Sequence, residues 1–552
     1  MSCLSADRVY RSCRVFLKPH AQAMPPGRNF STVVPIAAAI LSGCLCFLGF
    51  VGFGLYPLAF VAWVPVLWAT RGLSCQRTFW LGVIFGWVTN LGGFYWVGHL
   101  LEAFAGAGWA MARLGLLGLC LYQGVIFALA LFIVRRAARD FGLSPAFTLP
   151  IAFPAMEFAY PQIFPNNYGV TLYALPVLTQ VVEIFGVLAL SALIGLANGA
   201  LYELVEARVE RRPLVRRRLW ASGAIFVVVA AYGLIRIPMV ERDLESSTRH
   251  LRVALVQTNI GGRERDHHDG REKSAHLSMS LDVISRDPSI DLFVWPESAY
   301  DGYVFRRTRD LPKRVTEGLG VPVIFGGVSY DRRDDGAPEI FNTAVLTSST
   351  GAVQSMFDKT VLLAFGETLP LVDRFPSLLG VIRKWFPRTS LFTRGTTYEN
   401  FDVGGIKLMP MICYEDIIPS FVRDFWARAG APDALVNITN DSWYGDSHEP
   451  LIHLVLASFR ALETRRPLIR ATNTGVSAIV DPVGRLTART KQWEKDTLIE
   501  SVPIPDDMGT TPYVVFGDVY GWASLLVIGV GWAVGIRRRR SMARHDGRGP
   551  RR

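Results

Sequence analysis

Cysteine is almost absent from the second half of this chain. Of the seven cysteines in 552 residues, only Cys413 lies between residues 241 and 516. The others fall in the N-terminal tail or in and beside hydrophobic segments. No disulfide framework and no metal-type cysteine spacing is visible. An isolated cysteine is usually a small buried apolar residue and otherwise a candidate nucleophile, so both interpretations are open for Cys413.

Lysine and arginine are missing from the short loops near residues 52–54, 101–108 and 161–176. The polar segments at the other ends of the hydrophobic stretches hold 24 of the 58 Lys and Arg but only 5 of the 47 Asp and Glu. These basic segments are 1–30, 71–78, 135–144, 205–218 and 537–552. Because positive residues mark the cytoplasmic ends of membrane helices, we expect both termini in the cytoplasm.

The formal net charge of +11 does not indicate nucleic-acid binding. Outside the five basic segments the chain has 34 basic and 42 acidic residues, so the positive excess lies beside the hydrophobic stretches. A nucleic-acid site would instead need basic residues gathered on the soluble region. We therefore expect membrane lipid, and no nucleic acid, as a partner.

Long hydrophobic runs dominate the first 240 residues. Half of the chain is hydrophobic and its mean hydropathy is +0.26, which is typical of a membrane protein with a sizeable soluble domain. About eight transmembrane helices are predicted, at roughly 32–51, 55–70, 79–100, 109–134, 145–160, 177–204, 219–240 and 517–536. Most are near the ~20 residues that a helix needs to cross a bilayer. Since seven precede residue 241, the region after it must face away from the cytoplasm.

These boundaries predict five parts. They are a basic cytoplasmic tail (1–30), a membrane domain (31–240), a soluble domain (241–510), a final transmembrane helix (511–536) and a second basic cytoplasmic tail (537–552). In the soluble domain, helical patterns at 272–286 and 449–465 intervene between short apolar runs. The runs lie at 251–257, 292–295, 321–325, 343–346, 408–412, 434–438 and 477–480. This alternation predicts one layered α/β domain.

Five polar residues stand within the predicted spans: Asn90, Arg113, Glu157, Glu183 and Asn198. Ionisable groups inside a membrane are functional candidates. Several of these residues lie near span ends, however, where a polar side chain can reach the interface. Both interpretations are open.

Three chemically reactive side chains follow apolar runs in the soluble domain. They are Glu297 in Trp-Pro-Glu-Ser, Lys359 in Asp-Lys-Thr and Cys413 in Ile-Cys-Tyr-Glu-Asp. A thiol at a sharp strand-to-helix turn is exposed to substrate, but it needs a base to become a strong nucleophile. Glu297, partly desolvated, can be that base, and the Lys359 ammonium can stabilise an oxyanion. Each residue alone has an ordinary explanation, but the trio indicates acyl-transfer chemistry.

The trio, in this order, resembles that of the carbon–nitrogen hydrolase (nitrilase) superfamily. Eight spans with such a domain between the last two resemble one branch, the apolipoprotein N-acyltransferases. The similarity covers most of the chain after residue 30. It extends to the strings Phe-Gly-Leu-Tyr-Pro-Leu-Ala (53–59), Gly-Gly-Phe-Tyr-Trp (92–96), Phe-Gly-Glu (365–367), Thr-Asn-Asp-Ser-Trp-Tyr-Gly (439–445) and Arg-Ala-Thr-Asn-Thr-Gly-Val-Ser (470–477).

The resemblance implies a nitrilase-like αββα sandwich on the periplasmic face of a bacterial inner membrane. Cys413 would take an acyl chain from a phospholipid, typically phosphatidylethanolamine, as a thioester. It would pass this chain to the free α-amino group of a diacylglyceryl-modified apolipoprotein. Glu297 would be the base and Lys359 the oxyanion stabiliser, while Glu367 would support the site by orienting Lys359. Tyr414 and Glu415 match positions that the family needs beside the nucleophile.

The resemblance implies no cofactor and no metal. Four histidines could be proposed as a metal site, but nothing in their spacing requires it: His267, His268, His448 and His453. This interpretation is therefore disfavoured.

The sequence also departs from the family pattern. An aromatic residue usually follows the Val-Gln-x-Asn-Ile strand, whereas residues 256–260 here lead into Arg263–His268 without one. Ala364, Thr368 and Ile452 stand where proline, tyrosine and glutamine are usual. None of these changes touches the trio, so we expect altered substrate entry or preference and retained activity.

Two other functions compete with this one. A membrane-tethered amidase or hydrolase would use the same trio but pass the acyl group to water, and the eight-span arrangement counts against it. A transporter or lipid-binding protein with an inactive domain would predict a broken trio, and the trio is intact.

Overall fold

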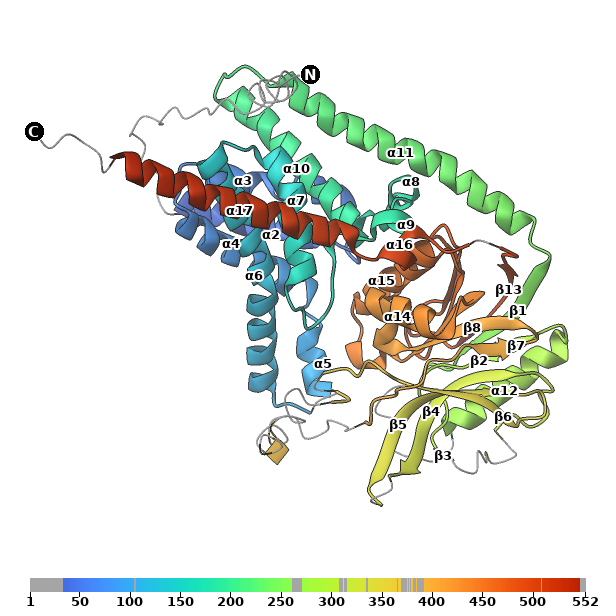
Figure 1. The fold of residues 1–552 in the computed structure, drawn as a ribbon. Helices are drawn as coiled ribbons and strands as arrows, with labels where there is room; N and C mark the ends of the chain where they lie inside the picture. The colour runs from blue at the N-terminus through green and yellow to red at the C-terminus, as the bar shows by residue number, and fades with distance from the viewer. Residues whose placement is uncertain are drawn as a thin grey trace, which may run out of the picture.

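The computed structural model describes residues 33–546 apart from short gaps. The gaps are 104–105, 261–270, 307–310, 312–314, 334–335, 365, 369–374, 376, 378, 381–383, 385–391 and 508. The predicted tail 1–30 therefore lies outside the described residues. Figure 1 shows the helices of the first half beside an α/β region that holds both sheets.

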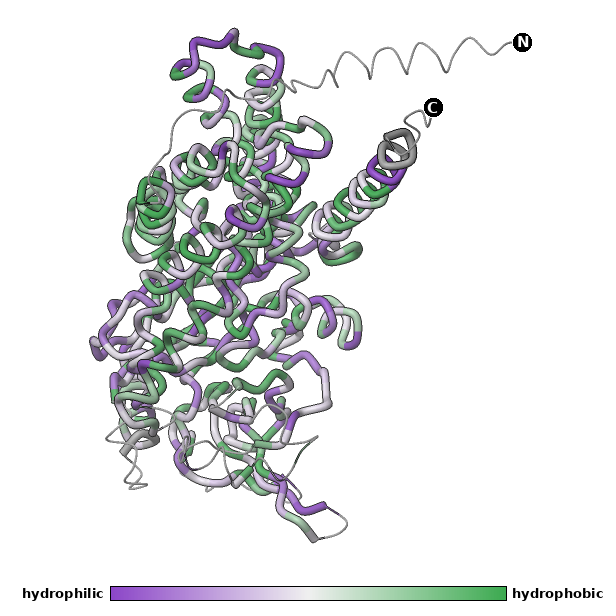
Figure 2. Tube along the Cα trace, turned by 90° about the vertical axis from the view of Figure 1, so that its left-hand side faces the viewer, coloured by the Kyte–Doolittle hydropathy of each residue, from purple (hydrophilic) through white to green (hydrophobic). Residues whose placement is uncertain are grey.

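The helical region is built from apolar segments of unequal length. Its helices are α2 (Val33–Leu48), α3 (Val64–Ala69), α4 (Cys75–Gly93), α5 (Val97–Ala103), α6 (Trp109–Phe141), α7 (Pro145–Ala159), α8 (Pro176–Thr179), α9 (Val182–Phe185), α10 (Leu188–Val209), α11 (Arg216–Glu245) and α17 (Val519–Asp546). The 3₁₀ helices η1 (Tyr56–Phe60) and η2 (Tyr168–Ala174) lie between them. Figure 2 shows hydrophilic residues gathered at the turn between α10 and α11 and at the end of α17.

Four of the described helices are long and apolar enough to cross a membrane. They are α6, α10, α11 and the part of α17 from Val519 to Arg540. Helices α11 and α17 are scarcely buried by the rest of the protein, so their apolar faces are available to lipid. The prediction of several long apolar helices is confirmed, whereas the predicted number of eight membrane spans is not established by these lengths.

Three predicted spans were wrong as continuous helices. Residues 177–204 form α8, α9 and α10 in succession, and Gly186 separates α9 from α10 with φ at +71°. That backbone conformation suits glycine, and a Cβ there would clash with the ring of Tyr513. The predicted span 55–70 is likewise divided, into η1 and α3, and the predicted span 79–100 is divided into α4 and α5.

The polar residues inside the predicted spans all have partners within the protein. Asn198 donates from Nδ2 to the Ala59 carbonyl at 2.7 Å and accepts from the Trp63 amide at 2.8 Å, so it joins two helical segments. Glu183 accepts from Arg465 at 2.7 Å and from Arg236 at 2.8 Å. The remaining contacts are Asn90 to the Gly86 carbonyl, Arg113 to Glu102, and Glu157 to the Tyr168 amide. These partners give each residue a structural role.

The first sheet of the α/β region has strand order β13-β1-β2-β4-β5-β6, and β3 pairs with β4. Its strands are β1 (Arg249–Gln257), β2 (Leu292–Val294), β3 (Tyr303–Phe305), β4 (Val323–Arg332), β5 (Pro338–Thr347), β6 (Val353–Asp358) and β13 (Asp496–Ile504). Strands β1, β2 and β4 are parallel, and β5 and β6 continue antiparallel. Helix α12 (Arg271–Arg286) packs on this sheet.

The second sheet has strand order β12-β11-β10-β9-β8-β7. Its strands are β7 (Phe401–Val403), β8 (Ile406–Ile412), β9 (Ala434–Thr439), β10 (Leu468–Thr472), β11 (Ala478–Val480) and β12 (Leu486–Arg489). Strands β8, β9 and β10 are parallel. The two sheets share one apolar core, which includes Val253 of β1 and Met411 of β8. The predicted layered α/β domain is confirmed, and so are its predicted apolar strands.

Helix α15 (Glu449–Thr464) joins the two regions. Leu454, Ala457 and Ala461 belong to the core between the sheets. Its other face, which includes Val455 and Phe459, belongs to the core of the helical region. A helix that is apolar on both faces must be buried on both. The α/β domain is therefore packed directly against the helical bundle through α15.

Candidate active site

The three residues of the predicted trio each follow a strand. Glu297 lies three residues after β2, Lys359 comes directly after β6, and Cys413 comes directly after β8. All three are buried, with 6%, 1% and 6% of their surface exposed. A buried charge is costly unless other groups compensate it, so the contacts of these side chains define the site.

Lys359 lies between two glutamates. Its Nζ donates to Glu367 Oε1 at 2.8 Å and lies 3.6 Å from Glu297 Oε1. Burial lowers the pKa of Lys359, but the charges of Glu367 and Glu297 raise it more, so its net pKa is above the ordinary value. The ammonium therefore stays charged at neutral pH and is available to stabilise a developing negative charge.

Asn342 on β5 bridges the two glutamates. Its Nδ2 donates to Glu297 Oε1 at 2.7 Å and to Glu367 Oε1 at 2.8 Å, which uses both amide hydrogens. The backbone carbonyl of Asn342 also accepts a hydrogen bond from the backbone amide of Lys359 at 2.8 Å. Sequence reasoning missed this residue, because it belongs to no recognisable string. Its position one residue before the predicted strand 343–346 is the only signal of it.

A tight turn carries Glu367 to Lys359. The amide of Glu367 donates to the Leu363 carbonyl at 2.9 Å, and the Leu363 amide donates back to Glu367 Oε2 at 2.9 Å. Ala364 and Thr368, which replace the usual proline and tyrosine, pair in an isolated bridge at this turn. The two replacements therefore leave the turn closed. We call Glu297, Asn342, Lys359 and Glu367 the carboxylate–lysine cluster.

Cys413 begins a short 3₁₀ helix, η4 (Cys413–Ile417), with φ at +51°. A non-glycine residue in this left-handed region is uncommon and marks a sharp turn, as predicted for a nucleophile after a strand. Burial raises the pKa of the Cys413 thiol, and Glu297 raises it further, whereas Lys359 and a hydrogen bond with Thr439 lower it. The resting thiol is therefore protonated, and a base must remove its proton before attack.

Glu415 connects the Cys413 turn to the Lys359 segment. Its Oε2 accepts from the Ile412 amide at 2.9 Å, on the strand before the nucleophile. Its Oε1 accepts from the Thr360 amide at 2.6 Å and the Val361 amide at 3.0 Å. Burial raises the pKa of Glu415 to about 7, against the lowering effect of these hydrogen bonds and of Lys359. Glu415 thus positions the nucleophile relative to the ammonium.

Tyr414 connects the nucleophile to the helical region. Its hydroxyl donates to the Ile163 carbonyl at 2.9 Å, and its ring lies 6.4 Å from that of Phe164. Trp96 in turn lies 5.6 Å from the Phe164 ring and 5.1 Å from the Tyr444 ring of the α/β domain. Two strings that the sequence analysis singled out in separate regions, 92–96 and 439–445, therefore meet here.

A second set of charged side chains lies under the nucleophile turn. Arg470 of β10 pairs with Asp416, and with Asp441 at 3.4 Å. The ring of His453 lies between the same two carboxylates, with Nε2 2.9 Å from Asp416 Oδ1 and Nδ1 3.1 Å from Asp441 Oδ1. We call these four residues the arginine–histidine cluster. Asn437 links it to the turn, because it accepts from Arg470 and donates to the Cys413 carbonyl at 3.2 Å.

His453 carries a proton on both ring nitrogens, because carboxylates can only accept hydrogen bonds. Burial and Arg470 lower the pKa of His453, but Asp416 and Asp441 raise it more, to about 10. Two positive and two negative groups then balance in the arginine–histidine cluster. Such a pairing is what a set of fully buried charges requires.

Asp441, Glu449 and His453 are also spaced as possible metal ligands, with one ligand atom of each within 4.8 Å of the others. Asp441 already pairs with Arg470, and both ring nitrogens of His453 already pair with Asp416 and Asp441. A metal would have to break these pairs, so Asp441 and His453 do not fit a metal site. His448 instead contacts Tyr95, with Nδ1 3.1 Å from its hydroxyl. His267, His268 and the rest of Arg263–His268 lie outside the described residues.

The structure thus brings together all six residues that the sequence singled out: Glu297, Lys359, Glu367, Cys413, Tyr414 and Glu415. The arrangement places a thiol beside a carboxylate and a buried ammonium. This combination suits nucleophilic attack on a carbonyl carbon, with the carboxylate taking the proton and the ammonium facing the oxyanion.

The chain is similar to known proteins over most of its length. The family described as carbon–nitrogen hydrolase matches residues 252–508, and the apolipoprotein N-acyltransferase N-terminal domain matches residues 42–200. Apolipoprotein N-acyltransferases from Geobacter metallireducens and Bdellovibrio bacteriovorus are each 30% identical to it, and in both cases the match covers 91% of this chain and 95% of the relative. Among solved structures, an amidase from Nesterenkonia sp. is 20% identical, with a TM-score of 0.34, over 49% of this chain and 95% of that one.

Proposed function

Because the chain belongs to the apolipoprotein N-acyltransferase family, we propose that it transfers an acyl chain from a phospholipid to the α-amino group of an apolipoprotein. The acceptor is the diacylglyceryl-modified cysteine at the apolipoprotein N-terminus, and the donor is typically phosphatidylethanolamine. One observation carries the chemistry: the buried Lys359 Nζ lies 3.6 Å from Glu297 and 2.8 Å from Glu367, and the ammonium charge lowers the pKa of the Cys413 thiol.

The first half-reaction forms a thioester. Glu297 takes the proton of the Cys413 thiol, and the thiolate attacks the carbonyl carbon of the donor ester. Lys359 stabilises the negative oxygen of the tetrahedral intermediate. When the intermediate collapses, the C–O bond of the ester breaks and Glu297 returns the proton to the departing alkoxide. The products are acyl-Cys413 and a lysophospholipid.

The second half-reaction forms an amide. The free amine of the apolipoprotein attacks the thioester carbonyl, and Glu297 accepts a proton from the amine nitrogen. Lys359 again faces the oxyanion. Collapse breaks the C–S bond, and the proton on Glu297 passes to the sulfur of Cys413. The same base and the same ammonium therefore serve both steps, which is a ping-pong scheme.

Contacts between the two regions support a role for the helices in substrate delivery. Both substrates are lipid-anchored, so the nucleophile must be held at a membrane surface. Tyr414 bonds to the Ile163 carbonyl, and α15 packs on the helical core. Water must also be kept from acyl-Cys413, since hydrolysis would release a free fatty acid. A lipid-packed entrance serves both needs.

The charge asymmetry of the loops supports an orientation in the bacterial inner membrane. Residues 241–510 form the catalytic domain on the periplasmic side, and both basic tails, 1–30 and 537–552, lie in the cytoplasm. A cysteine introduced at exposed Lys495 should react with an impermeant maleimide in spheroplasts, whereas one at exposed Arg540 should react only after permeabilisation. The reverse pattern would contradict this orientation.

The function is tested by mass spectrometry of a lipoprotein N-terminus in cells depleted of this protein. Wild type should restore the third acyl chain, and Cys413→Ala should leave a free amine. Cys44→Ala, which removes a half-buried cysteine of α2, is the matched control and should rescue fully. Full rescue by Cys413→Ala would end the proposed mechanism. Release of free fatty acid without an acylated acceptor would identify a hydrolase.

A further inference from the structure

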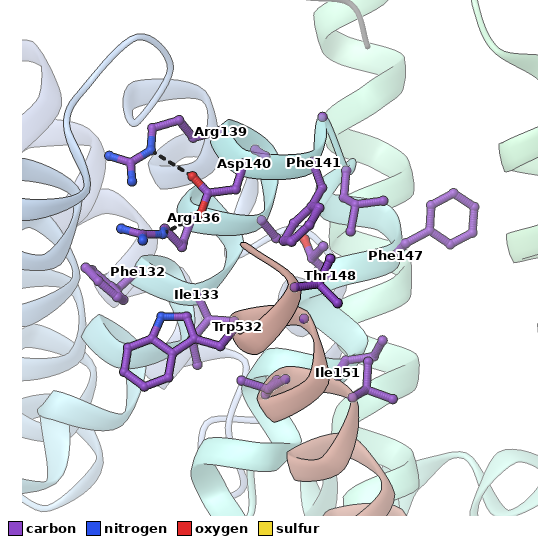
Figure 3. A pocket seen from close by; sticks show the side chains of 18 of the residues that line it. Phe132, Ile133, Arg136, Arg139, Asp140, Phe141, Phe147, Thr148, Ile151 and Trp532 are labelled. Atoms are coloured by element: carbon purple, nitrogen blue, oxygen red, sulfur yellow. Dashed lines mark hydrogen bonds and ion pairs between the residues drawn. The ribbon is translucent and has the colours of Figure 1, made fainter. Parts of the chain in front are cut away.

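A cavity of about 760 Å³ lies between α6, α7 and α17 (Figure 3). The helix ends that line it are at the end of the helical region away from the α/β domain (Figure 1). Its walls are mainly apolar and include Phe132 and Ile133 of α6, Ile151 of α7, and Val527 and Trp532 of α17. The volume is within the range of small-molecule sites, about 300–1,000 Å³. Because α17 is scarcely buried and the Trp532 side chain is exposed, this cavity opens toward lipid.

Arginines gather at one end of this cavity. Arg136 and Arg139 of α6 and Arg539 of α17 all pair with Asp140, at 2.7, 3.2 and 2.9 Å. Arg538, which lines the cavity, lies 5.4 Å over the Phe141 ring. Three guanidinium groups therefore share the Asp140 carboxylate, and Arg538 adds a fourth positive group. Asp140 is the only carboxylate among the lining residues that the structure describes. The rim of the cavity carries a clear excess of positive charge.

We propose that this cavity binds an anionic phospholipid from the leaflet opposite the catalytic domain. The acyl chains lie along the apolar walls, and the phosphate pairs with the arginines at the rim. Guanidinium groups bind phosphate oxygens through charge-assisted hydrogen bonds, and basic pockets between membrane helices are suited to acidic headgroups. The lipid is distinct from the acyl donor, because the nucleophile lies at the other end of the molecule.

A lipid in this cavity would contact α17, which is joined to the rest of the protein at both ends. Helix α17 contacts α7 and α6, and Arg539 with Asp140 joins its far end to α6. Its near end continues from α16 (Pro512–Phe516), which contacts α15 beside the catalytic domain. A lipid in the cavity fills the space between α17 and its neighbours, so its binding stabilises the folded protein.

The proposal is tested by native mass spectrometry of the full-length protein in detergent. The probes are phosphatidylglycerol and phosphatidylcholine with identical acyl chains. We expect wild type to retain phosphatidylglycerol at least about fivefold more than phosphatidylcholine, a ratio that one charge-assisted contact can supply. Arg139→Gln with Arg538→Gln should remove the preference. The control pair, Arg537→Gln with Arg540→Gln, changes exposed arginines of α17 outside the lining and should preserve it.

Two glycines of α17 provide an independent steric test. A Cβ added at Gly531 or at Gly529 meets no heavy atom within 4 Å, so both positions accept a larger residue. Only Gly531 lines the cavity. Gly531→Trp should therefore abolish phosphatidylglycerol retention and the thermal stabilisation that this lipid confers, whereas Gly529→Trp should leave both unchanged.

Equal retention of the two lipids by wild type would overturn the proposal, and so would unchanged retention in Gly531→Trp. Acyl transfer by each variant is measured in the same detergent, with the donor phospholipid and a lipopeptide acceptor. Loss of lipid retention with normal acyl transfer supports a separate lipid site. Absence of acyl transfer by wild type, with phosphatidylglycerol retention as expected, would instead count against the proposed function alone.

Discussion

The carboxylate–lysine cluster and the arginine–histidine cluster both lie near the Cys413 turn, and they balance charge in different ways. In the first, one ammonium serves two glutamates, and an amide, Asn342, shares its hydrogens between them. In the second, two cations meet two carboxylates. The first therefore keeps an excess of negative charge that can accept a proton, whereas the second has none. The carboxylate–lysine cluster is therefore suited to the reaction, and the arginine–histidine cluster is suited to supporting the fold around it.

Replacement of Lys359 should mainly lower activity, whereas replacement of Arg470 should mainly lower stability. The loss of activity in the Lys359 variant is the largest effect we predict. Lys359→Met should lower kcat/KM for acyl transfer by about 1,000-fold, because the oxyanion loses its charged partner. The folded protein should survive, since Glu297 and Glu367 still accept from Asn342 and either can take up a proton. The measurement is transfer to a lipopeptide together with the melting temperature.

Arg470→Met is the matched change in the arginine–histidine cluster. Here Asp416 and Asp441 lose a fully buried partner, and breaking such a pair costs about 3–5 kcal/mol. The melting temperature should fall more than in Lys359→Met. If Lys359→Met proved the less stable protein and kept its activity, the division between a reactive and a supporting cluster would be wrong.

Asn342 is the second donor to the glutamates of the carboxylate–lysine cluster, and it is a neutral amide. In the arginine–histidine cluster both donors, Arg470 and His453, are cations. Asn342→Ala should lower kcat by about 10- to 100-fold, since misplacement of a base by about 1 Å has that effect. Its KM for the acceptor should change little. The control is Asn400→Ala, because Asn400 makes a comparable amide contact, to the Ala429 carbonyl, away from the site. An unchanged kcat in Asn342→Ala would remove Asn342 from the mechanism.

The pKa of His453 predicts how the arginine–histidine cluster responds to pH. Its folded pKa, about 10, is above the ordinary 6.5, so its stabilisation is complete below pH 6.5 and is lost as pH rises through 10. The difference in melting temperature between wild type and His453→Leu should therefore be largest near pH 6 and shrink toward pH 10. The same replacement at exposed His250 should shift the melting temperature little at any pH. A difference that grows with pH would contradict the charged state of His453.

The sequence could point to Glu297, Lys359 and Cys413 because strand ends and short strings are local features. Cys413 directly follows a continuous apolar run, and its sharp turn could be expected from that run alone. Asn342 could not be found in this way, since its role depends on two glutamates that are 45 and 25 residues away in the chain. Long-range pairing leaves no local pattern.

The same reason explains what was missed in the helical region. A hydropathy pattern measures length, and residues 177–204 are apolar enough for one helix. The hydropathy pattern does not reveal the positive φ of Gly186, beside which the Tyr513 ring packs. It also does not reveal the pairing of Glu183 with Arg465 of the α/β domain. These contacts join segments about 280 to 330 residues apart. The break in the helix is therefore a tertiary feature, which only the fold reveals.

Tyr414 yields the smallest predicted effect and tests whether the two regions act together. Tyr414→Phe removes one neutral hydrogen bond, to the Ile163 carbonyl, which is worth about 0.5–1.5 kcal/mol. If this contact holds the nucleophile turn against the helices, kcat/KM should fall by about 2- to 10-fold. Tyr160→Phe removes a bond of the same length, 2.9 Å, to the Tyr122 carbonyl within the helical region. It should leave acyl transfer unchanged, and equal effects of the two variants would show that the Tyr414 contact has only a structural role.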